Sequence, residues 1–300
     1  MSPAEVEVRA SRRDKMFFPD AGVTKGQVFD YYRDVAEAML PHLRRRPATL
    51  RRFPDGIDAE GFFQKEVSGH FPDWLDVADV PLRQGGVQHY AVVSDVASLL
   101  YLADQATIEF HIWPSAIDSL DDPDLIVVDI DPPQEIALAE LRSVARRTRD
   151  LLSDLGLVPF VQATGGKGFH VVAPLDASAS FDEVRALAAD AADALVDSDP
   201  RRLTTAQRKR DRGDRIFLDV NRNGYAQTFV TPYSLRARPG ATAAVPLDWD
   251  ELGKAEPNGW NITRALRRLA RKADPWASIY DHAASAHAAR QRLASLVDRG

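Results

Sequence analysis

The sequence of 300 residues contains no cysteine, and this absence narrows the chemistry open to it. Without thiols the chain forms neither disulfides nor thiolate metal sites, so a bound metal must use oxygen or imidazole ligands. Long hydrophobic runs are also lacking, because no stretch approaches the roughly 18 uncharged apolar residues that span a bilayer. The hydrophobic share of 45% and the charged share of 27% are ordinary for a globular protein. We therefore expect a cytoplasmic protein that has no membrane partner.

An excess of basic residues is lacking as well, since the net charge is −6. A protein that coats nucleic acid normally carries a surplus of Lys and Arg. Basic residues are nevertheless concentrated locally: residues 201–215 carry seven of them against Asp211 and Asp214. Smaller clusters lie at 44–52 and 264–272. Such patches suit a protein that grips phosphates at defined positions, and the alternative is a set of solvated helix faces.

Two carboxylates one residue apart follow an apolar run at 125–128. The run is rich in Val and Ile, which predicts a buried strand. Side chains alternate along a strand, so Asp129 and Asp131 point to the same side, about 6–7 Å apart. Neighbouring carboxylates are costly to desolvate, and a divalent cation removes that cost. Asp219, on an apolar strand predicted at 215–220, supplies a third carboxylate. The pattern predicts a metal-dependent phosphoryl-transfer site.

A glycine-rich turn separates two predicted strands, at 157–163 and 171–173. It has the sequence Thr-Gly-Gly-Lys-Gly-Phe-His, residues 164–170. A strand follows it, whereas a P-loop or a Rossmann fingerprint requires a helix at that place. Glycines let backbone N–H groups approach an anion, which favours an anion site over a plain tight hairpin. The residues predicted to form this site are Thr164, Gly165, Lys167, Gly168 and His170.

A capping box, Thr24 with Gln27 three residues later, begins a helix predicted over 25–40. The first turn of a helix offers free N–H groups and the positive end of the dipole. Lys25 lies on that turn and Lys15 is close in sequence. The arrangement suits a bound phosphate, and the alternative is an ordinary capped surface helix.

A hairpin with a loose loop is predicted from 50–53 and 61–65. Phe62 and Phe63 are adjacent on its second strand and therefore face opposite sides. We expect one of them to enter the core. The other is left either to pack against a loop or to stack on a base.

The strand predicted at 107–113 alternates cleanly, with Glu109, His111 and Trp113 on its polar face. Other expected elements are a helix from Ser94, helices at 135–155, 181–196 and 261–272, a strand at 228–238 and a helical turn at 248–252. Neither a repeat nor a long linker interrupts them. We expect one compact domain of the α/β (α+β) class.

Taken together, these motifs resemble the polymerase domain of bacterial ATP-dependent DNA ligase D, a member of the archaeo-eukaryotic primase superfamily. The matching motifs are Val-Val-Asp-Ile-Asp-Pro-Pro, Thr-Gly-Gly-Lys-Gly-Phe-His, Phe-Leu-Asp-Val-Asn, Pro-Tyr-Ser-Leu-Arg-Ala-Arg and Pro-Leu-Asp-Trp-Asp-Glu-Leu. They occur in the family's order between about residues 10 and 255. The resemblance implies a primase-type polymerase core, a mixed or antiparallel β-sheet flanked by helices. The domain would occupy residues 1–300, with a C-terminal helical extension at about 256–300.

The resemblance also implies a function. The family's polymerase domains are nucleotidyltransferases that add nucleotides, preferably ribonucleotides, to DNA ends or gaps during non-homologous end joining. The implied cofactors are two Mn²⁺ or Mg²⁺ ions. The implied partners are DNA with 5′-phosphate ends or gaps, NTP or dNTP, a Ku-type end-binding protein and a DNA ligase, in the nucleoid of a bacterial cytoplasm. Two alternatives stay open, a non-catalytic module that bridges 5′-phosphorylated ends and a metal-dependent phosphodiesterase.

Residue roles follow by motif. The resemblance makes Asp129, Asp131 and Asp219 the catalytic metal ligands. The implied nucleotide contacts are His111, Thr164, Gly165, Lys167, Gly168, His170, Arg222, Arg236, Arg52 and Lys65. The implied DNA contacts are Lys15 and Lys25 for a 5′-phosphate across a gap, Phe62 and Phe63 for bases, and Arg212. Thr164 stands where the family usually has Ser and keeps the hydroxyl group.

Overall fold

The structure, a computed structural model, describes residues 6–67 and 69–297, and the chain divides into two compact units. Unit 1 consists of Met1–Trp113, Phe229–Val245 and Trp260–Ala273, and unit 2 of Pro114–Thr228, Pro246–Gly259 and Asp274–Gly300. Because each unit takes three separate segments, no single cut in the chain separates them. The predicted domain, residues 1–300, extends beyond the described residues at both ends. The predicted mixed α/β class is confirmed.

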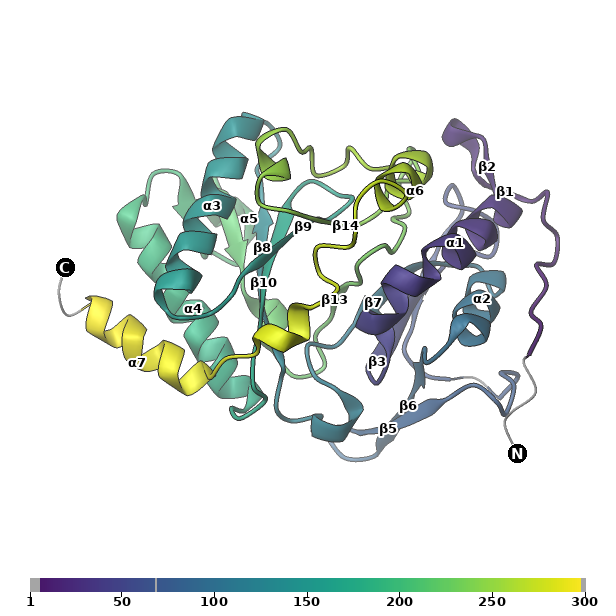
Figure 1. Ribbon diagram of the computed structural model, residues 1–300, viewed down its shortest axis with the longest axis horizontal. Helices are drawn as coiled ribbons and strands as arrows, with labels where there is room; N and C mark the ends of the chain where they lie inside the picture. The colour runs from purple at the N-terminus through teal and green to yellow at the C-terminus, as the bar shows by residue number, and fades with distance from the viewer. Residues whose placement is uncertain (1–5, 68, 298–300) are drawn as a thin grey trace. The chain divides into compact units, whose positions relative to one another are not determined.

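Unit 2 is built on a six-stranded sheet with the order β11-β12-β8-β10-β9-β14 (Figure 1). The strand β8 is antiparallel to both of its neighbours, β10 and β12, whereas β11 is parallel to β12. The bounds are β8 Leu125–Asp131, β9 Phe160–Ala163, β10 Phe169–Pro174, β11 Leu203–Thr204, β12 Ile216–Asp219 and β14 Val245–Leu247. This arrangement sets the ends of β8 and β12 side by side.

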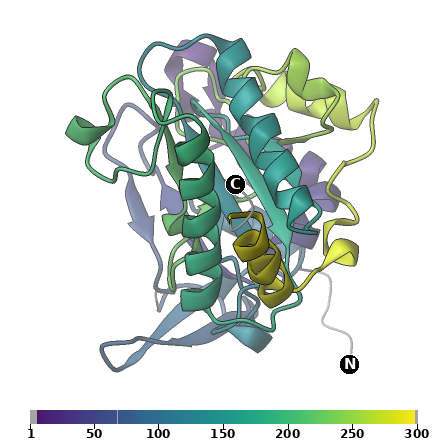
Figure 2. The same cartoon turned by 90° about the vertical axis from the view of Figure 1, so that its left-hand side faces the viewer.

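Helices cover this sheet. Figure 2 shows α3 (Leu138–Asp154) and α4 (Phe181–Ser198) lying over the strands, with α7 (Ala286–Val297) against α4. A capping box at Ser180 begins α4, because its hydroxyl accepts from the backbone N–H of Glu183. The helix α3 begins at 138 and not at the predicted 135. Ala137 is its N-cap in an extended conformation and makes no side-chain capping hydrogen bond. A short helix, α5 (Lys209–Arg212), lies in the basic stretch.

Unit 1 contains a second sheet, with the order β13-β7-β3-β6-β5 and β4 paired to β3. The bounds are β3 Pro47–Arg52, β4 Phe62–Gln64, β5 Val77–Pro81, β6 Val87–Val92, β7 Thr107–Ile112 and β13 Phe229–Val230. A two-stranded sheet pairs β1 (Met16–Phe18) with β2 (Val23–Thr24). The α-helices described in unit 1 are α1 (Lys25–Leu43), α2 (Val96–Asp104) and α6 (Ile262–Leu269). The predicted hairpin of 50–53 with 61–65 is confirmed as the antiparallel pair β3–β4.

Two expected boundaries in unit 1 were wrong, and the polar face predicted for β7 is shielded from water. The helix α1 does not stop before Pro41 but runs to Leu43, with Pro41 inside its last turn. On β7, Glu109 is buried and His111 is half-buried, so the face that carries them is polar but largely inaccessible. The strand expected over 228–238 is only the two-residue β13, and the chain then turns through positions with positive φ, including Tyr233.

Among the described residues, no helix combines the length and the hydropathy needed to cross a bilayer.

Candidate active site

Three carboxylates meet at the ends of two neighbouring strands of unit 2. Asp129 on β8 lies opposite Asp219 on β12 in the antiparallel register, and Asp131 lies two residues further along β8. Carboxylate oxygens of all three lie within 4.8 Å of one another. We call this group the acidic centre. Burial, followed by the charges of Asp129 and Asp219, raises the pKa of Asp131 to about 6.

A histidine and an arginine border the acidic centre. His170 Nε2 lies 3.4 Å from Asp129 Oδ1, because β10 pairs with β8 and sets these residues opposite each other. Arg222 Nε lies 3.4 Å from Asp129 Oδ2, and its Nη2 lies 3.6 Å from Asp219 Oδ2. Asn221 donates from its backbone N and from Nδ2 to Asp219 Oδ1, at 2.9 and 2.8 Å. The structure thus brings two predicted nucleotide contacts to the predicted metal ligands.

The donor set of the acidic centre fits a hard divalent cation. All three ligand groups are carboxylates, which suit Mg²⁺ and Mn²⁺, and they converge from a rigid sheet. Burial, followed by the charges of Asp129 and Asp219, raises the pKa of Asp131, so ionising all three carboxylates is costly without a further counter-charge. A cation at this place would remove the repulsion.

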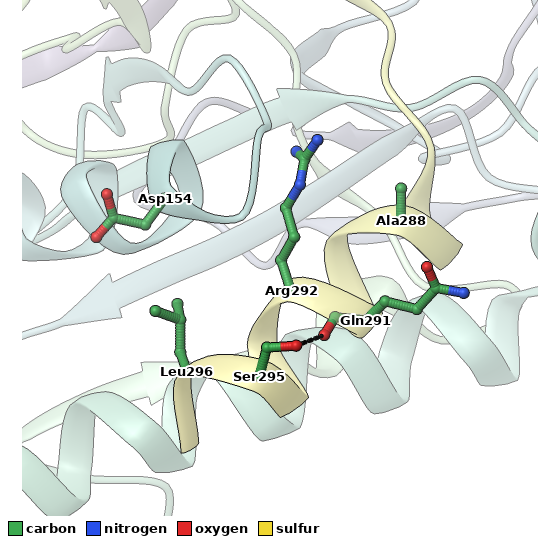
Figure 3. Close-up of a pocket in the computed structure, with 6 residues that line it drawn as sticks. All are labelled: Asp154, Ala288, Gln291, Arg292, Ser295 and Leu296. Carbon is green, nitrogen blue, oxygen red and sulfur yellow. Dashed lines mark hydrogen bonds between the residues drawn. The ribbon is translucent and has the colours of Figure 1, made fainter. Parts of the chain in front are cut away.

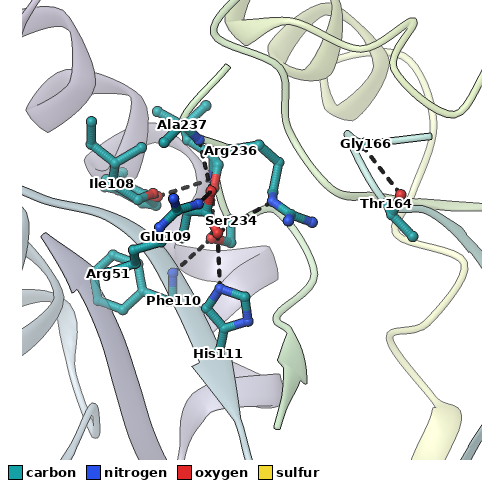
Figure 4. Close-up of polar contacts among 12 residues, drawn as sticks. Arg51, Ile108, Glu109, Phe110, His111, Thr164, Gly166, Ser234, Arg236 and Ala237 are labelled. Atoms are coloured by element: carbon teal, nitrogen blue, oxygen red, sulfur yellow. Dashed lines mark hydrogen bonds and ion pairs between the residues drawn. The ribbon is translucent and has the colours of Figure 1, made fainter. Parts of the chain in front are cut away.

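The glycine loop, residues 164–168, joins β9 to β10 as predicted. Gly165 has φ +66°, and a Cβ on Gly168 would lie 1.9 Å from the backbone oxygen of Ile130. Only glycine permits that approach to the end of β8. Thr164 Oγ1 donates to Gly168 O at 2.8 Å and accepts from Gly166 N at 3.2 Å (Figure 4). Thr164 therefore braces the loop.

One detail of the loop differs from the prediction. The N–H groups of Gly165 and Gly166 do not face outward to receive an anion, because they donate to Pro257 O and to the Thr164 hydroxyl. Lys167 is exposed. The loop therefore offers an anion the Lys167 side chain more readily than those two backbone donors.

In unit 1, the buried side chain of Glu109 lies close to Arg51, His111 and Arg236 (Figure 4). Glu109, with a side chain only 2% exposed, accepts from Arg51 Nη1 at 3.1 Å and contacts His111 Nε2 at 2.9 Å. Arg236 Nε lies 3.4 Å from the same carboxylate, and Ala237 N donates to it at 2.8 Å. We call this set the glutamate centre.

The surroundings of Glu109 decide its protonation. Burial alone would raise the pKa of this carboxyl. The hydrogen bond with His111 and the charge of Arg236 outweigh burial and hold the pKa well below its usual range. Glu109 is thus an anion that holds two predicted nucleotide contacts, His111 and Arg236, in place. Sequence reasoning missed it, although a carboxylate two residues before a His on one strand was a usable signal.

A hollow of about 390 Å³ lies at the start of α1, and we call it the lysine hollow. Its lining residues are Ser11, Arg12, Lys15, Phe17, Lys25, Arg52, Pro54, Asp104, Gln105 and Ala106. The structure thus brings together Lys15 and Lys25, as predicted. Arg52, predicted to contact nucleotide, lines the same hollow.

The backbone donors predicted for this place are not free. Lys25 N donates to Lys15 O at 2.8 Å, and Gly26 N donates to Arg13 O at 2.9 Å. The segment before the helix folds back and satisfies the first turn. An anion in the lysine hollow would therefore be held by side chains and not by the helix terminus.

The remaining predicted DNA contacts differ in their accessibility. Phe62 and Phe63 are 46% and 60% exposed, so the prediction that one enters the core was wrong. They are held instead by the guanidinium groups of Arg52 and Arg51, at 5.5 and 5.4 Å from the ring centroids. An exposed pair of aromatic rings is available for stacking.

Arg212 and Lys65 present their charges differently. Arg212 in unit 2 lies 3.5 Å above the Phe217 ring and donates to the carbonyl oxygens of Ala206 and Gln207, at 2.9 and 2.8 Å. The Arg212 guanidinium is therefore already engaged in contacts that stabilise the basic stretch, residues 201–215. Lys65 follows β4 and is exposed.

A second hollow, of about 450 Å³, lies in unit 2 where α7 meets the end of α3 (Figure 3). Arg292 projects over it and donates from Nη1 to Leu155 O at 2.9 Å. That bond closes the carboxyl end of α3 and fastens α7 to it. The predicted site residues do not line this hollow, whose residues are Asp154, Ala288, Gln291, Arg292, Ser295 and Leu296.

Comparisons with known proteins agree with the predicted resemblance. A family model described as LigD, primase-polymerase domain, matches residues 24–276. The multifunctional non-homologous end joining DNA repair protein LigD of Mycobacterium tuberculosis is 36% identical over 281 residues, which cover 91% of this chain and 37% of that protein. The LigD of Pseudomonas aeruginosa is 31% identical over 306 residues, 99% of this chain and 35% of that protein.

A solved structure is similar as well. It is described as the polymerase domain from Mycobacterium tuberculosis ligase D in complex with DNA. It matches with a TM-score of 0.86 at 34% sequence identity and covers 92% of this chain and 99% of the other. The chain spans little more than a third of the length of those two LigD relatives. The range matched by the family model includes the acidic centre and the glycine loop.

Proposed function

The chain belongs to the LigD primase-polymerase family, and on that premise we propose that it is a metal-dependent nucleotidyltransferase acting on DNA. It would add nucleotides, with ribonucleotides preferred, to DNA ends and gaps during non-homologous end joining. The observation that carries the proposal is the acidic centre, three carboxylates with oxygens within 4.8 Å of one another at the ends of two neighbouring strands, β8 and β12. A module that only bridges DNA ends would not need such a group of carboxylates, so the centre favours a catalytic role.

Asp129, Asp131 and Asp219 would hold the cations, which we propose to be two Mn²⁺ or Mg²⁺ ions. Bound divalent cations would supply electrostatic stabilisation of the charge that develops on the attacking and leaving oxygens. The chain's own task is to keep the three carboxylates deprotonated and converging. Arg222 assists, because its Nε lies 3.4 Å from Asp129 Oδ2, where its charge lowers the cost of holding three anions together. His170 Nε2 lies 3.4 Å from Asp129 Oδ1 on the neighbouring strand.

The residues proposed to bind the incoming nucleotide have different tasks. Lys167 on the glycine loop presents an exposed ammonium to phosphate. Gly165 and Gly168 give the loop its shape, and Thr164 braces it. Neutralising the charge on a transferring phosphoryl group is the largest contribution that such side chains make. The loop therefore suits the phosphates of NTP or dNTP.

The glutamate centre supports the proposal for unit 1. Glu109 fixes His111 and Arg236, so that both enter a complex already oriented. Pre-oriented donors lose less conformational entropy when they bind phosphate. We propose His111 and Arg236 as contacts of the triphosphate, and Lys65 as a further cation for nucleotide.

DNA contacts are proposed at two places in unit 1 and one in unit 2. The lysine hollow would take the 5′-phosphate on the far side of a gap, with Lys15 and Lys25 as its cations. The exposed Phe62 and Phe63 would stack on bases, and Arg212 would support the basic stretch near DNA. A Ku-type end-binding protein and a DNA ligase are the proposed protein partners.

A second candidate function is a non-catalytic module that binds 5′-phosphorylated ends, and the lysine hollow favours it. The deciding experiment supplies labelled nucleotide, a gapped primer-template and Mn²⁺ to the native chain and to an Asp129→Ala/Asp131→Ala variant. We expect extension of the primer by the native chain and a loss of at least about 10³-fold in the variant, which still binds the gapped DNA. Extension that survives the double substitution refutes the proposed catalytic centre. Tight phosphate-dependent binding without any extension establishes the second candidate.

A further inference from the structure

The lysine hollow contains an acid to which the family resemblance gives no role. Lys25 Nζ lies 2.5 Å from Asp104 Oδ1, and the two side chains are only 6% and 15% exposed. Ser11 donates to the same oxygen from its backbone N at 2.7 Å and from Oγ at 2.9 Å. Lys25 Nζ also donates to Ser11 Oγ at 2.7 Å. The charge of Lys25 is therefore neutralised inside the protein.

The second lysine of the hollow is neutralised much less effectively. Lys15 Nζ lies 2.7 Å from Asp55 Oδ1, but the Asp55 side chain is 75% exposed. Water and salt screen a carboxylate in that position. Asp104 is screened far less, because its side chain is largely buried beside Lys25. The two otherwise similar ion pairs thus differ in how strongly each acid opposes an approaching anion.

Arg52 keeps the hollow attractive to an anion all the same. Its guanidinium donates to the backbone oxygen of Gln105 and to Gln64 Oε1, both at 2.6 Å. Both partners are neutral, so these bonds orient Arg52 without cancelling its charge. Arg12 also lines the hollow and adds a further cation.

We propose that Asp104 is a specificity-determining residue of the lysine hollow, which opposes a terminal phosphate monoester at Lys25 and so lowers the preference for 5′-phosphorylated DNA. The inference rests on the proposed function, because it deepens the role of the 5′-phosphate subsite. A phosphate dianion that reaches Lys25 enters a weakly screened place already occupied by a carboxylate. Either the Lys25–Asp104 pair opens or the two anions share one ammonium, and both cost binding free energy.

Asp104→Asn isolates this effect. An asparagine keeps the size of the side chain, and its amide oxygen still accepts from Ser11 and Lys25, so only the charge is removed. Asp55→Asn is the matched control, because it removes the partner of the other lysine at an exposed place. The measurement is the affinity for a gapped duplex whose downstream strand ends in a 5′-phosphate or a 5′-hydroxyl, followed by fluorescence anisotropy. Removing any acid from an acidic protein strengthens DNA binding in general, and the hydroxyl-ended duplex corrects for that.

The expected result is a change in the ratio of the two affinities. Asp104→Asn should raise the preference for phosphate over hydroxyl by about tenfold, while Asp55→Asn changes it less than about twofold. A preference that stays the same or falls in Asp104→Asn overturns the inference, and so does a native chain with no preference at all. If Asp104→Asn does not fold, as judged by its thermal unfolding, Asp104→Ser takes its place with the same expectation.

Failure of the inference can be distinguished from failure of the proposed function. Nucleotide addition is measured on the same protein and the same DNA. A native chain that prefers phosphate but adds no nucleotide refutes the polymerase function and leaves the inference about Asp104 intact. A native chain that adds nucleotide and has a preference unaffected by Asp104→Asn refutes the inference alone.

Discussion

The carboxylates of the glutamate centre in unit 1 and of the acidic centre in unit 2 have opposite surroundings. In unit 1, Glu109 is enclosed by His111, Arg236 and Arg51. Burial alone would raise its pKa, but the hydrogen bond with His111 and the charge of Arg236 hold that pKa well below its usual range. In unit 2, Asp131 lies beside two more carboxylates, and burial together with their charges raises its pKa to about 6. The glutamate centre is complete in itself, whereas the acidic centre holds negative charge in excess. The difference supports the proposal that the first positions side chains and that the second is the site for a cation.

The comparison predicts a large effect when the anion is removed from the glutamate centre. Glu109→Gln leaves two or three cations around a neutral amide and loses a buried pairing that is worth about 3 kcal/mol of unfolding free energy. If His111 and Arg236 contact the triphosphate, their loss of orientation should lower kcat/KM for nucleotide addition by about 100-fold. Denaturant unfolding and steady-state kinetics give the two numbers. Glu140→Gln, which breaks the ion pair of a surface glutamate with Arg202 at 3.6 Å, serves as the control.

The contribution of Glu109 to the free energy of unfolding depends on pH, and the sign of that dependence follows from its lowered pKa. A carboxyl whose pKa is lowered by folding stabilises the protein fully above its usual pKa of 4.5, and this stabilisation is lost as the pH falls. The difference in unfolding free energy between the native chain and Glu109→Gln should therefore be largest near neutral pH and shrink below about pH 4.5. A difference that grows on acidification would contradict the description of Glu109 as an anion held by cations.

A smaller effect of opposite sign is expected in the acidic centre. Asp131→Asn removes one of three mutually repelling carboxylates, so the metal-free protein should gain about 1 kcal/mol of unfolding free energy. The same variant should lose most of the additional stability that Mn²⁺ gives to the native chain. Denaturant titrations with and without Mn²⁺ measure both changes. Asp150→Asn, at a side chain 61% exposed, should change neither by more than about 0.5 kcal/mol. Loss of stability in metal-free Asp131→Asn would show that the three carboxylates do not repel one another.

Much of the acidic centre could be predicted from the sequence. The alternation along β8 places Asp129 and Asp131 on one side, and the apolar run before Asp219 predicts a second strand. The three carboxylates converge because their two strands belong to one sheet. The resemblance implied that sheet, and the register of β8 with β12 confirms the pairing. The glycine loop was also predicted, because three glycines between two predicted strands indicate a turn at that place.

The remainder depends on contacts between distant segments. Glu109 accepts a hydrogen bond from the backbone N–H of Ala237, a residue 128 positions away, and no local sequence pattern predicts that bond. Phe62 and Phe63 could not be assigned to the surface from alternation alone, because the arginines that hold them lie on the neighbouring strand β3. The first turn of α1 has an ordinary capping signature, whereas its backbone donors are satisfied by the folded-back segment before it.

Binding of Mn²⁺ at equilibrium tests the central claim most directly, with free Mn²⁺ followed by electron paramagnetic resonance. The native chain, Asp219→Asn and Glu109→Gln are compared at the same protein concentration. The account predicts that Asp219→Asn weakens Mn²⁺ binding by at least about tenfold, and that Glu109→Gln changes it less than about twofold. Binding that is unaffected by Asp219→Asn, or that is weakened equally by Glu109→Gln, would contradict the assignment of the cation site to the acidic centre.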